Sequence, residues 1–164
     1  MQEKNVTEIL SELVKIKSIS SDKNHIADVK KSAEFVEKLF LELGLQTKIA
    51  TSGNSRPAVL AQTEINPDRK TVLLYAHHDV QPVGDINKWE TDPFNPEIIN
   101  GRLFGRGSGD NKAGVVIHHE VVKELMKDLP VNIKIFIEGE EEIGSPCMAQ
   151  FLDEFNKELE ADVI

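Results

Sequence analysis

Three side chains that can bind a metal or move a proton follow directly after an apolar run. The run covers Val72 to Ala76 in the stretch TVLLYAHHD, and it ends at His77, His78 and Asp79. An apolar run of this length predicts a strand buried on both faces, as in a parallel sheet covered by helices. Because side chains alternate along a strand, His77 and Asp79 should share one face and His78 the other. His77 is therefore a candidate metal ligand with Asp79 as its orienting carboxylate, and the alternative is a solvated strand end.

Further acidic groups follow later in the chain. Asp110 ends the stretch GRGSGD, and Glu138, Glu140, Glu141 and Glu142 follow another apolar run. Close carboxylates repel one another unless a proton or a cation intervenes, although a solvated acidic turn is the alternative for the glutamates. Imidazole and carboxylate ligands together suit zinc, manganese or cobalt. A carboxylate that bridges two metals about 3.5–4 Å apart would give a hydrolytic site.

The glycines before Asp110 do not form a phosphate-binding loop. Their spacing matches neither the dinucleotide fingerprint nor a Walker loop, and Asp110 would place negative charge at the anion site. We expect instead that these glycines let the backbone turn sharply, so that Asp110 enters a crowded site.

The hydrophobic pattern predicts alternating helices and strands. Apolar residues at helical spacing predict a first helix capped by Asn5 or Thr7 and further helices over 26–43, 112–128 and 146–157. Strands are predicted over 46–51, 57–65, 71–77 and 131–137, with a small hairpin at 98–104 and a strand beginning at 161–164. Such alternation of strands and helices along the chain indicates an α/β fold.

Composition narrows the classes of function. The chain has 164 residues, enough for one domain, and a formal net charge of -9, which argues against a nucleic-acid partner. Cys147 is the only cysteine, so an intrachain disulfide is excluded. No segment approaches the roughly 20 apolar residues that span a bilayer, and we expect a cytoplasmic protein without a membrane partner.

The sequence resembles the M20 family of metallopeptidases, which includes dipeptidases, carboxypeptidases, aminoacylases and desuccinylases. The resemblance rests on AHHDVQP (76–82), W…DPF (89–94), NGRLFGRGSGDNKAG (100–114) and EGEEEIGS (138–145), in this order along the chain. It implies a three-layer α/β/α fold of the zinc-exopeptidase type with a mostly parallel, mixed sheet.

The resemblance also implies a role for each site residue. His77 would bind one metal, Asp79 would orient His77, and Asp110 would bridge two metals. Of the paired glutamates, Glu141 would be the general base and Glu142 a metal ligand. Two Zn²⁺ ions per complete site are implied, with Co²⁺ or Mn²⁺ as alternatives. Related enzymes carry a cis peptide bond after the bridging aspartate, so one is expected between Asp110 and Asn111 where the site is properly formed.

Other polar residues near these motifs receive smaller roles. We expect Glu138 to support the site and Glu140 to be an exposed neighbour. His78 occupies the variable middle position of the HxD motif and is left out of the ligand set. His118 and His119 fall within the helix predicted over 112–128, where they should be packing or surface groups.

Part of the family's ligand set does not occur in this sequence. The family uses a further aspartate soon after the strand that begins ADVI, a later histidine, and an oxyanion-stabilising histidine from a lid domain. Residues 1–164 are therefore expected to be a truncated, N-terminal portion of a catalytic domain, without the lid and the C-terminal part. Such a chain should be inactive alone and bind metal weakly.

The predicted function is hydrolysis of a peptide or amide bond in a small substrate by a two-metal site. The variant DVQP favours a dipeptidase over a desuccinylase. The alternatives are an N-acyl-amino-acid deacylase or desuccinylase and, in another class, an incomplete fragment or interaction module. The expected partners are a small peptide or an N-acyl amino acid, and the resemblance allows a homodimer of the full-length protein.

Overall fold

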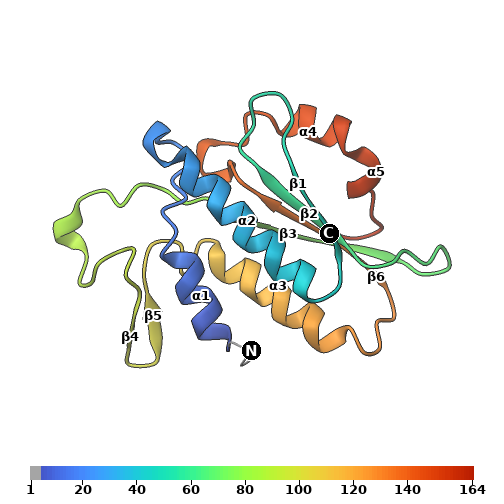
Figure 1. Ribbon diagram of the computed structural model, residues 1–164, viewed down its shortest axis with the longest axis horizontal. Helices are drawn as coiled ribbons and strands as arrows, with labels where there is room; N and C mark the ends of the chain where they lie inside the picture. Colours follow the sequence, from blue (N-terminus) through green and yellow to red (C-terminus); the bar gives the residue numbers. More distant parts are fainter. Residues whose placement is uncertain (1–4) are drawn as a thin grey trace.

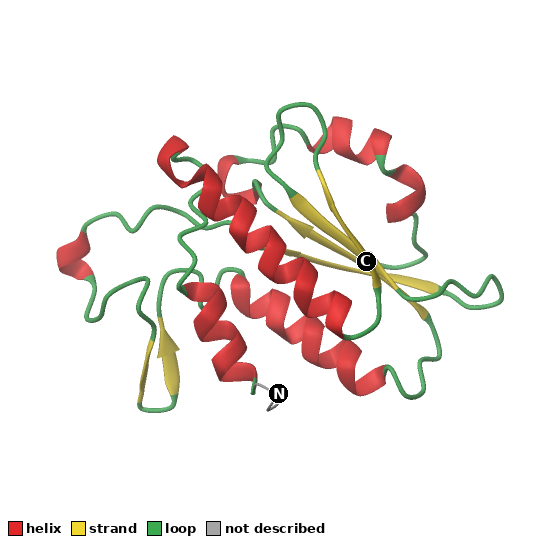
Figure 2. Ribbon diagram, viewed as in Figure 1, coloured by secondary structure: helices red, strands yellow, loops and turns green. Residues whose placement is uncertain are grey.

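The computed structural model describes residues 5–164, and its sheet lies between two helical layers (Figure 1, Figure 2). The first four residues of the polar N-terminal stretch lie outside this range. The α-helices α1, α2 and α3 cover one face of the sheet, while α4 and α5 cover the other. The predicted α/β/α layering is confirmed.

Local sequence signals set the helix boundaries on the first face. Helix α1 spans Val6–Val14 and begins with a capping box, in which Asn5 and Glu8 each accept the backbone N–H of the other. Asn5 is therefore the cap, and Thr7 is not. Helices α2 and α3 span Ile26–Glu42 and Lys112–Leu125, each ending within three residues of the predicted boundary.

The sheet is mixed and has four strands in the order β1-β2-β6-β3. These strands are β1 Gln46–Ala50, β2 Ala58–Gln62, β3 Thr71–His77 and β6 Asn132–Glu138. Strands β1 and β2 pair antiparallel, as do β2 and β6, whereas β3 pairs parallel with β6. The strand predicted from 161 is present as a single parallel bridge between Val163 and Val72.

The strand that is buried on both faces is β6. The sequence predicted this for β3, the run that ends at His77, and that prediction is wrong. Every residue of β6 is buried because β2 and β3 flank it and helices cover both its faces. Strand β3 lies at the edge of the sheet, where Tyr75 stays 38% exposed. Polar residues of β6 are buried too: the Lys134 ammonium donates to the carbonyls of Lys157 and Glu160.

Two hydrophobic clusters hold the layers together. The larger lies between the sheet and α1 to α3 and includes Leu13, Phe40, Val115 and Ile135. The smaller joins the sheet to α4 (Met148–Glu154) and α5 (Asn156–Leu159), with Phe151 at its centre. The single helix predicted over 146–157 is thus two helices, because the backbone leaves helical geometry between them.

The long connection between β3 and α3 contains the predicted hairpin. Strands β4 (Glu97–Ile99) and β5 (Arg102–Phe104) are joined by Asn100 and Gly101, which both have positive φ. This is the turn that an Asn-Gly pair favours. The shorter 3₁₀ turns are η1 (Lys23–His25), η2 (Ile86–Lys88) and η3 (Glu141–Ile143). Among residues 5–164, no helix combines the length and the apolarity that crossing a bilayer requires.

Candidate metal centre

The candidate site lies where the carboxyl ends of β3 and β6 meet. These strands are parallel, and their last paired residues are His77 and Glu138. The turn η3, with Glu141 and Glu142, begins three residues after the end of β6, and Asp110 lies two residues before the start of α3. In open α/β sheets ligands bind outside the carboxyl ends of strands, and here three separate segments meet at such an edge.

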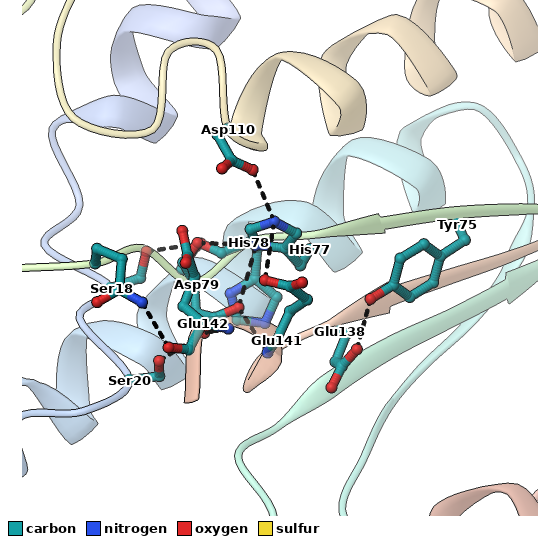
Figure 3. A network of polar contacts seen from close by, with 12 residues as sticks. Ser18, Ser20, Tyr75, His77, His78, Asp79, Asp110, Glu138, Glu141 and Glu142 are labelled. Carbon is teal, nitrogen blue, oxygen red and sulfur yellow. Dashed lines mark hydrogen bonds and ion pairs between the residues drawn. The ribbon is translucent and has the colours of Figure 1, made fainter. Parts of the chain in front are cut away.

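The structure brings carboxylates from two predicted segments to one imidazole nitrogen, that of His77. His77 Nε2 lies 3.1 Å from Asp110 Oδ1 and 3.6 Å from Glu141 Oε2, and Figure 3 shows these two carboxylates on opposite sides of the ring. Ligand atoms of His77, Glu141 and Glu142 all lie within 4.8 Å of one another. The Asp110 side chain is 78% exposed, so this group lies on the solvent side of the site.

Asp79 holds the other nitrogen of the same ring. Its Oδ1 lies 3.3 Å from His77 Nδ1, and both side chains are buried. The backbone N–H groups of Glu141 and Glu142 donate to Oδ1 and Oδ2 of Asp79 at 3.2 and 3.1 Å. Burial alone would raise the pKa of Asp79, but the hydrogen bonds from His77 and Ser20 hold it below its usual value. A carboxylate on Nδ1 leaves Nε2 free to bind a metal.

The electrostatics of the site fit a bound cation. Burial would lower the pKa of His77, but the hydrogen bond and charge of Asp79, followed by the charge of Glu141, raise it to about 9. Burial raises the pKa of Glu142, and the charges of Asp110 and Asp79 add to this effect. The imidazole therefore lies in a negative field that favours positive charge. Because metal ions compete with protons for such groups, this set of nitrogen and oxygen donors fits a zinc-type ion.

The segment before α3 turns as the glycines predict. Gly107 has a φ of +84°, and a Cβ there would lie 2.6 Å from Cγ1 of Val80. A larger residue would be excluded both by backbone conformation and by space. The predicted cis peptide bond is present between Asp110 and Asn111.

The remaining histidines near the motifs do not face the site. His78 is fully buried, its Nε2 is 2.9 Å from the Pro57 carbonyl, and burial lowers its pKa to about 4. It is therefore neutral and held away from His77, as strand alternation predicts. His119 packs edge-on against Phe40, and His118 contacts the carbonyl of Tyr75, which confirms their expected roles.

Comparison with known proteins places this site in a family. A model of the peptidase family M20/M25/M40 matches residues 73–164. The chain belongs to this family. The match contains His77, Asp110, Glu141 and Glu142, and residues before 73 lie outside it.

Relatives of this M20 chain include dipeptidases and a carboxypeptidase. The chain is 40% identical over 149 residues to the Cys-Gly metallodipeptidase dug1 of Schizosaccharomyces pombe, an alignment of 83% of this chain and 31% of the relative. The crystal structure of human carnosine dipeptidase 1 has a TM-score of 0.83 at 30% identity, covering 93% of this chain and 35% of that one. The M20 metallo-carboxypeptidase Sso-CP2 of Sulfolobus solfataricus has a TM-score of 0.84 at 33% identity, covering 99% and 37%. This chain therefore spans about a third of the length of these relatives.

The structure corrects one expectation about the glutamates of this M20 chain. Glu140 is not an exposed neighbour: its side chain is buried, and its two oxygens accept the backbone N–H groups of Arg56 and Cys147. Two backbone donors compensate for the burial of the carboxylate. Glu138 is also buried and accepts the Tyr75 hydroxyl at 2.6 Å.

Sequence reasoning missed Ser20, which donates to Asp79 Oδ2 at 2.6 Å. It lies 59 residues before Asp79, in the stretch after α1 that was predicted only as a loop. The sequence offers only a weak signal for it, because Ser18 and Ser20 flank an apolar residue, Ile19, a few residues after an amphipathic helix. The structure shows that all three residues are buried.

Proposed function

We propose that this chain provides most of the catalytic site of a metal-dependent hydrolase that cleaves a peptide bond in small peptides. His77, Asp110 and Glu142 would hold the metal, and Glu141 would be the general base. The observation that carries the proposal is the position of His77 Nε2 between carboxylates from two separate segments, while Asp79 holds Nδ1.

The residues divide the chemistry in a physically consistent way. When bound, divalent cations would lower the pKa of a water molecule and polarise the substrate carbonyl. Asp79 fixes the His77 ring and, through the backbone N–H groups of Glu141 and Glu142, the start of η3. The Glu141 side chain is 43% exposed, so its carboxylate is accessible to take a proton from water and return it to the leaving amine.

We infer that the substrates are dipeptides. The similar proteins are named for Cys-Gly and for β-Ala-His or carnosine, which are all dipeptides. The motif DVQP that favours a dipeptidase follows His78 directly, and Gln81 in it donates to the Glu142 carbonyl. Zn²⁺ is the proposed metal, two ions per complete site, with Co²⁺ and Mn²⁺ as alternatives.

The test is an assay of the complete natural polypeptide with Cys-Gly and β-Ala-His, with and without a chelator and with each metal restored. Glu141→Gln should lower kcat by about 10²–10⁴ while bound metal stays near wild type, because the base is lost and the volume is kept. Glu142→Gln should instead lose metal, as elemental analysis would show. Glu154→Gln, at an exposed position of α4, is the matched control.

Each outcome has a clear meaning. Turnover of Glu141→Gln within a few-fold of wild type would refute the assignment of the base. Metal-dependent cleavage of N-acyl amino acids without cleavage of dipeptides would make the protein a deacylase instead. Hydrolysis that persists unchanged in chelator would contradict the metal-dependent function.

A further inference from the structure

A loop near the start of the chain reaches the candidate metal centre. Ser20 Oγ donates to Asp79 Oδ2 at 2.6 Å, and both side chains are fully buried. The loop runs beside the segment that follows β3, because Ile19 forms a parallel bridge with Val80 and the Val80 N–H donates to the Ser18 carbonyl. Ser20 is therefore fixed against Asp79 by both backbone and side-chain contacts.

The Asp79 carboxylate that Ser20 contacts also holds the acidic turn. Oδ2, the acceptor for Ser20, accepts the Glu142 N–H at 3.1 Å, while Oδ1 accepts the Glu141 N–H at 3.2 Å and faces His77 Nδ1 at 3.3 Å. The bond from Ser20 is the shortest of the four. This carboxylate therefore contacts the His77 ring and the start of η3 at the same time, and the Asp79 main-chain carbonyl contacts His77 Nδ1 as well, at 3.2 Å.

A second connection leads from Ser20 to the same turn. The Ser20 carbonyl accepts two hydrogen bonds from the Arg56 guanidinium, at 3.2 and 3.1 Å. The Arg56 backbone N–H donates to Glu140, whose other oxygen accepts the Cys147 N–H. The hydroxyl and the carbonyl of Ser20 thus both connect to the segment that carries Glu141 and Glu142.

We propose that Ser20 is a positioning residue of the metal centre, acting through Asp79 on His77, Glu141 and Glu142. The proposal rests on the metal site proposed above and adds a residue outside the family match at 73–164. Mutation of a residue that orients a metal ligand through a hydrogen bond typically weakens metal binding by about 10–100-fold. Because Asp79 keeps its other donors, we expect a loss of about tenfold for Ser20→Ala, at the lower end of this range.

The experiment compares three serines of one loop in the complete natural polypeptide. Ser20→Ala removes the donor to Asp79. Ser18→Ala removes an equally buried hydroxyl, whose acceptor is the backbone carbonyl of His78, and so controls for loss of a buried hydrogen bond. Ser21→Ala changes an exposed neighbour.

Amide hydrogen exchange in chelator is measured first, so that the coupling is tested without metal. Ser20→Ala should speed exchange of the Glu141 and Glu142 amides by about tenfold, the value of one typical hydrogen bond, and the two control variants should not. Co²⁺ is then added, and its affinity and visible absorption spectrum are recorded. Ser20→Ala should weaken Co²⁺ binding about tenfold and shift the absorption bands, whereas Ser21→Ala should match wild type.

Two results would overturn the proposal: unchanged exchange at Glu141 and Glu142 in Ser20→Ala, or equal Co²⁺ affinity in Ser20→Ala and Ser18→Ala. If Ser20→Ala does not fold, exchange in wild type decides, because coupling is reciprocal. The Asp22 and Val80 amides donate to the carbonyls of Ile19 and Ser18 and so report on the loop of Ser20. Co²⁺ should slow their exchange as well as that of the Glu142 amide. Slowing at Glu142 alone would overturn the proposal. Failure of wild type to bind Co²⁺ would refute the metal site itself, which the exchange data in chelator do not require.

Discussion

Replacing Asp79 with asparagine should destabilise the protein, although the two side chains have nearly the same shape. Oδ1 accepts the N–H of Glu141 and Oδ2 accepts that of Glu142. The amide of asparagine has one oxygen and one NH₂ group. In either orientation the NH₂ group therefore faces a backbone N–H, which loses its acceptor. The carboxylate charge beside His77 is lost as well.

The magnitude follows from these contacts. A hydrogen bond to a charged group contributes about 1.5–3 kcal/mol, and a buried donor without an acceptor costs about 1–3 kcal/mol. Burial of the carboxylate itself was unfavourable, which offsets part of the sum. We expect Asp79→Asn to lower the free energy of unfolding by about 3 kcal/mol. Urea denaturation in chelator, followed by circular dichroism, measures this without a contribution from metal.

The matched control is Asp85→Asn. Asp85 is exposed, and its side chain accepts local hydrogen bonds from Asn87. Asparagine serves this capping role about as well as aspartate, so stability should change by less than about 0.5 kcal/mol. A loss below about 1 kcal/mol for Asp79→Asn, equal to that of the control, would show that this carboxylate does not connect the three segments.

Two further variants test the packing around the site. Gly139→Ala should lower the free energy of unfolding, measured by urea denaturation, by about 1–3 kcal/mol, because its Cβ would collide with the carbonyl oxygen of Pro57. Gly109→Ala, which has open space around it, should lower this free energy by less than half as much. Equal losses in the two variants would contradict the packing around Gly139. Lys112→Met should lower the free energy of unfolding by about 2 kcal/mol, because the fully buried ammonium donates to the carbonyls of Leu13 and Ile16 near the end of α1. A loss of stability no larger than that of Lys15→Met, at an exposed position, would contradict this role.

The sequence predicts the parts of the site that depend on local pattern. Strand alternation places His77 beside Asp79 and turns His78 away, and the structure agrees. The glycines before Asp110 predict a sharp turn, and Gly107 has the positive φ that such a turn requires. These features follow from the geometry of neighbouring residues, so the order of residue types is sufficient to find them.

Features that depend on distant partners were not predictable in the same way. Glu140 looks like part of a solvated acidic run, and only its donors, one of them 84 residues away, show why it is buried. The hydroxyl of Ser20 reaches Asp79 across 59 residues. The sequence likewise predicted burial on both faces for β3, whereas the structure shows it for β6. The reason is that β6 is an inner strand and β3 an edge strand, and the composition of a single strand does not reveal its place in the sheet. In each case tertiary structure supplies the partner.

X-ray absorption at the zinc edge, recorded on the zinc-loaded protein, tests the proposed metal centre most directly. For the complete natural polypeptide we expect a shell of nitrogen and oxygen at about 2.0–2.2 Å with imidazole scattering. This scattering should be weaker in His77→Gln and unchanged in His25→Gln, whose ring lies by Asp28 in another part of the chain. Imidazole scattering as strong in His77→Gln as in wild type, or a sulfur shell at about 2.3 Å from Cys147, would contradict the assignment of the site.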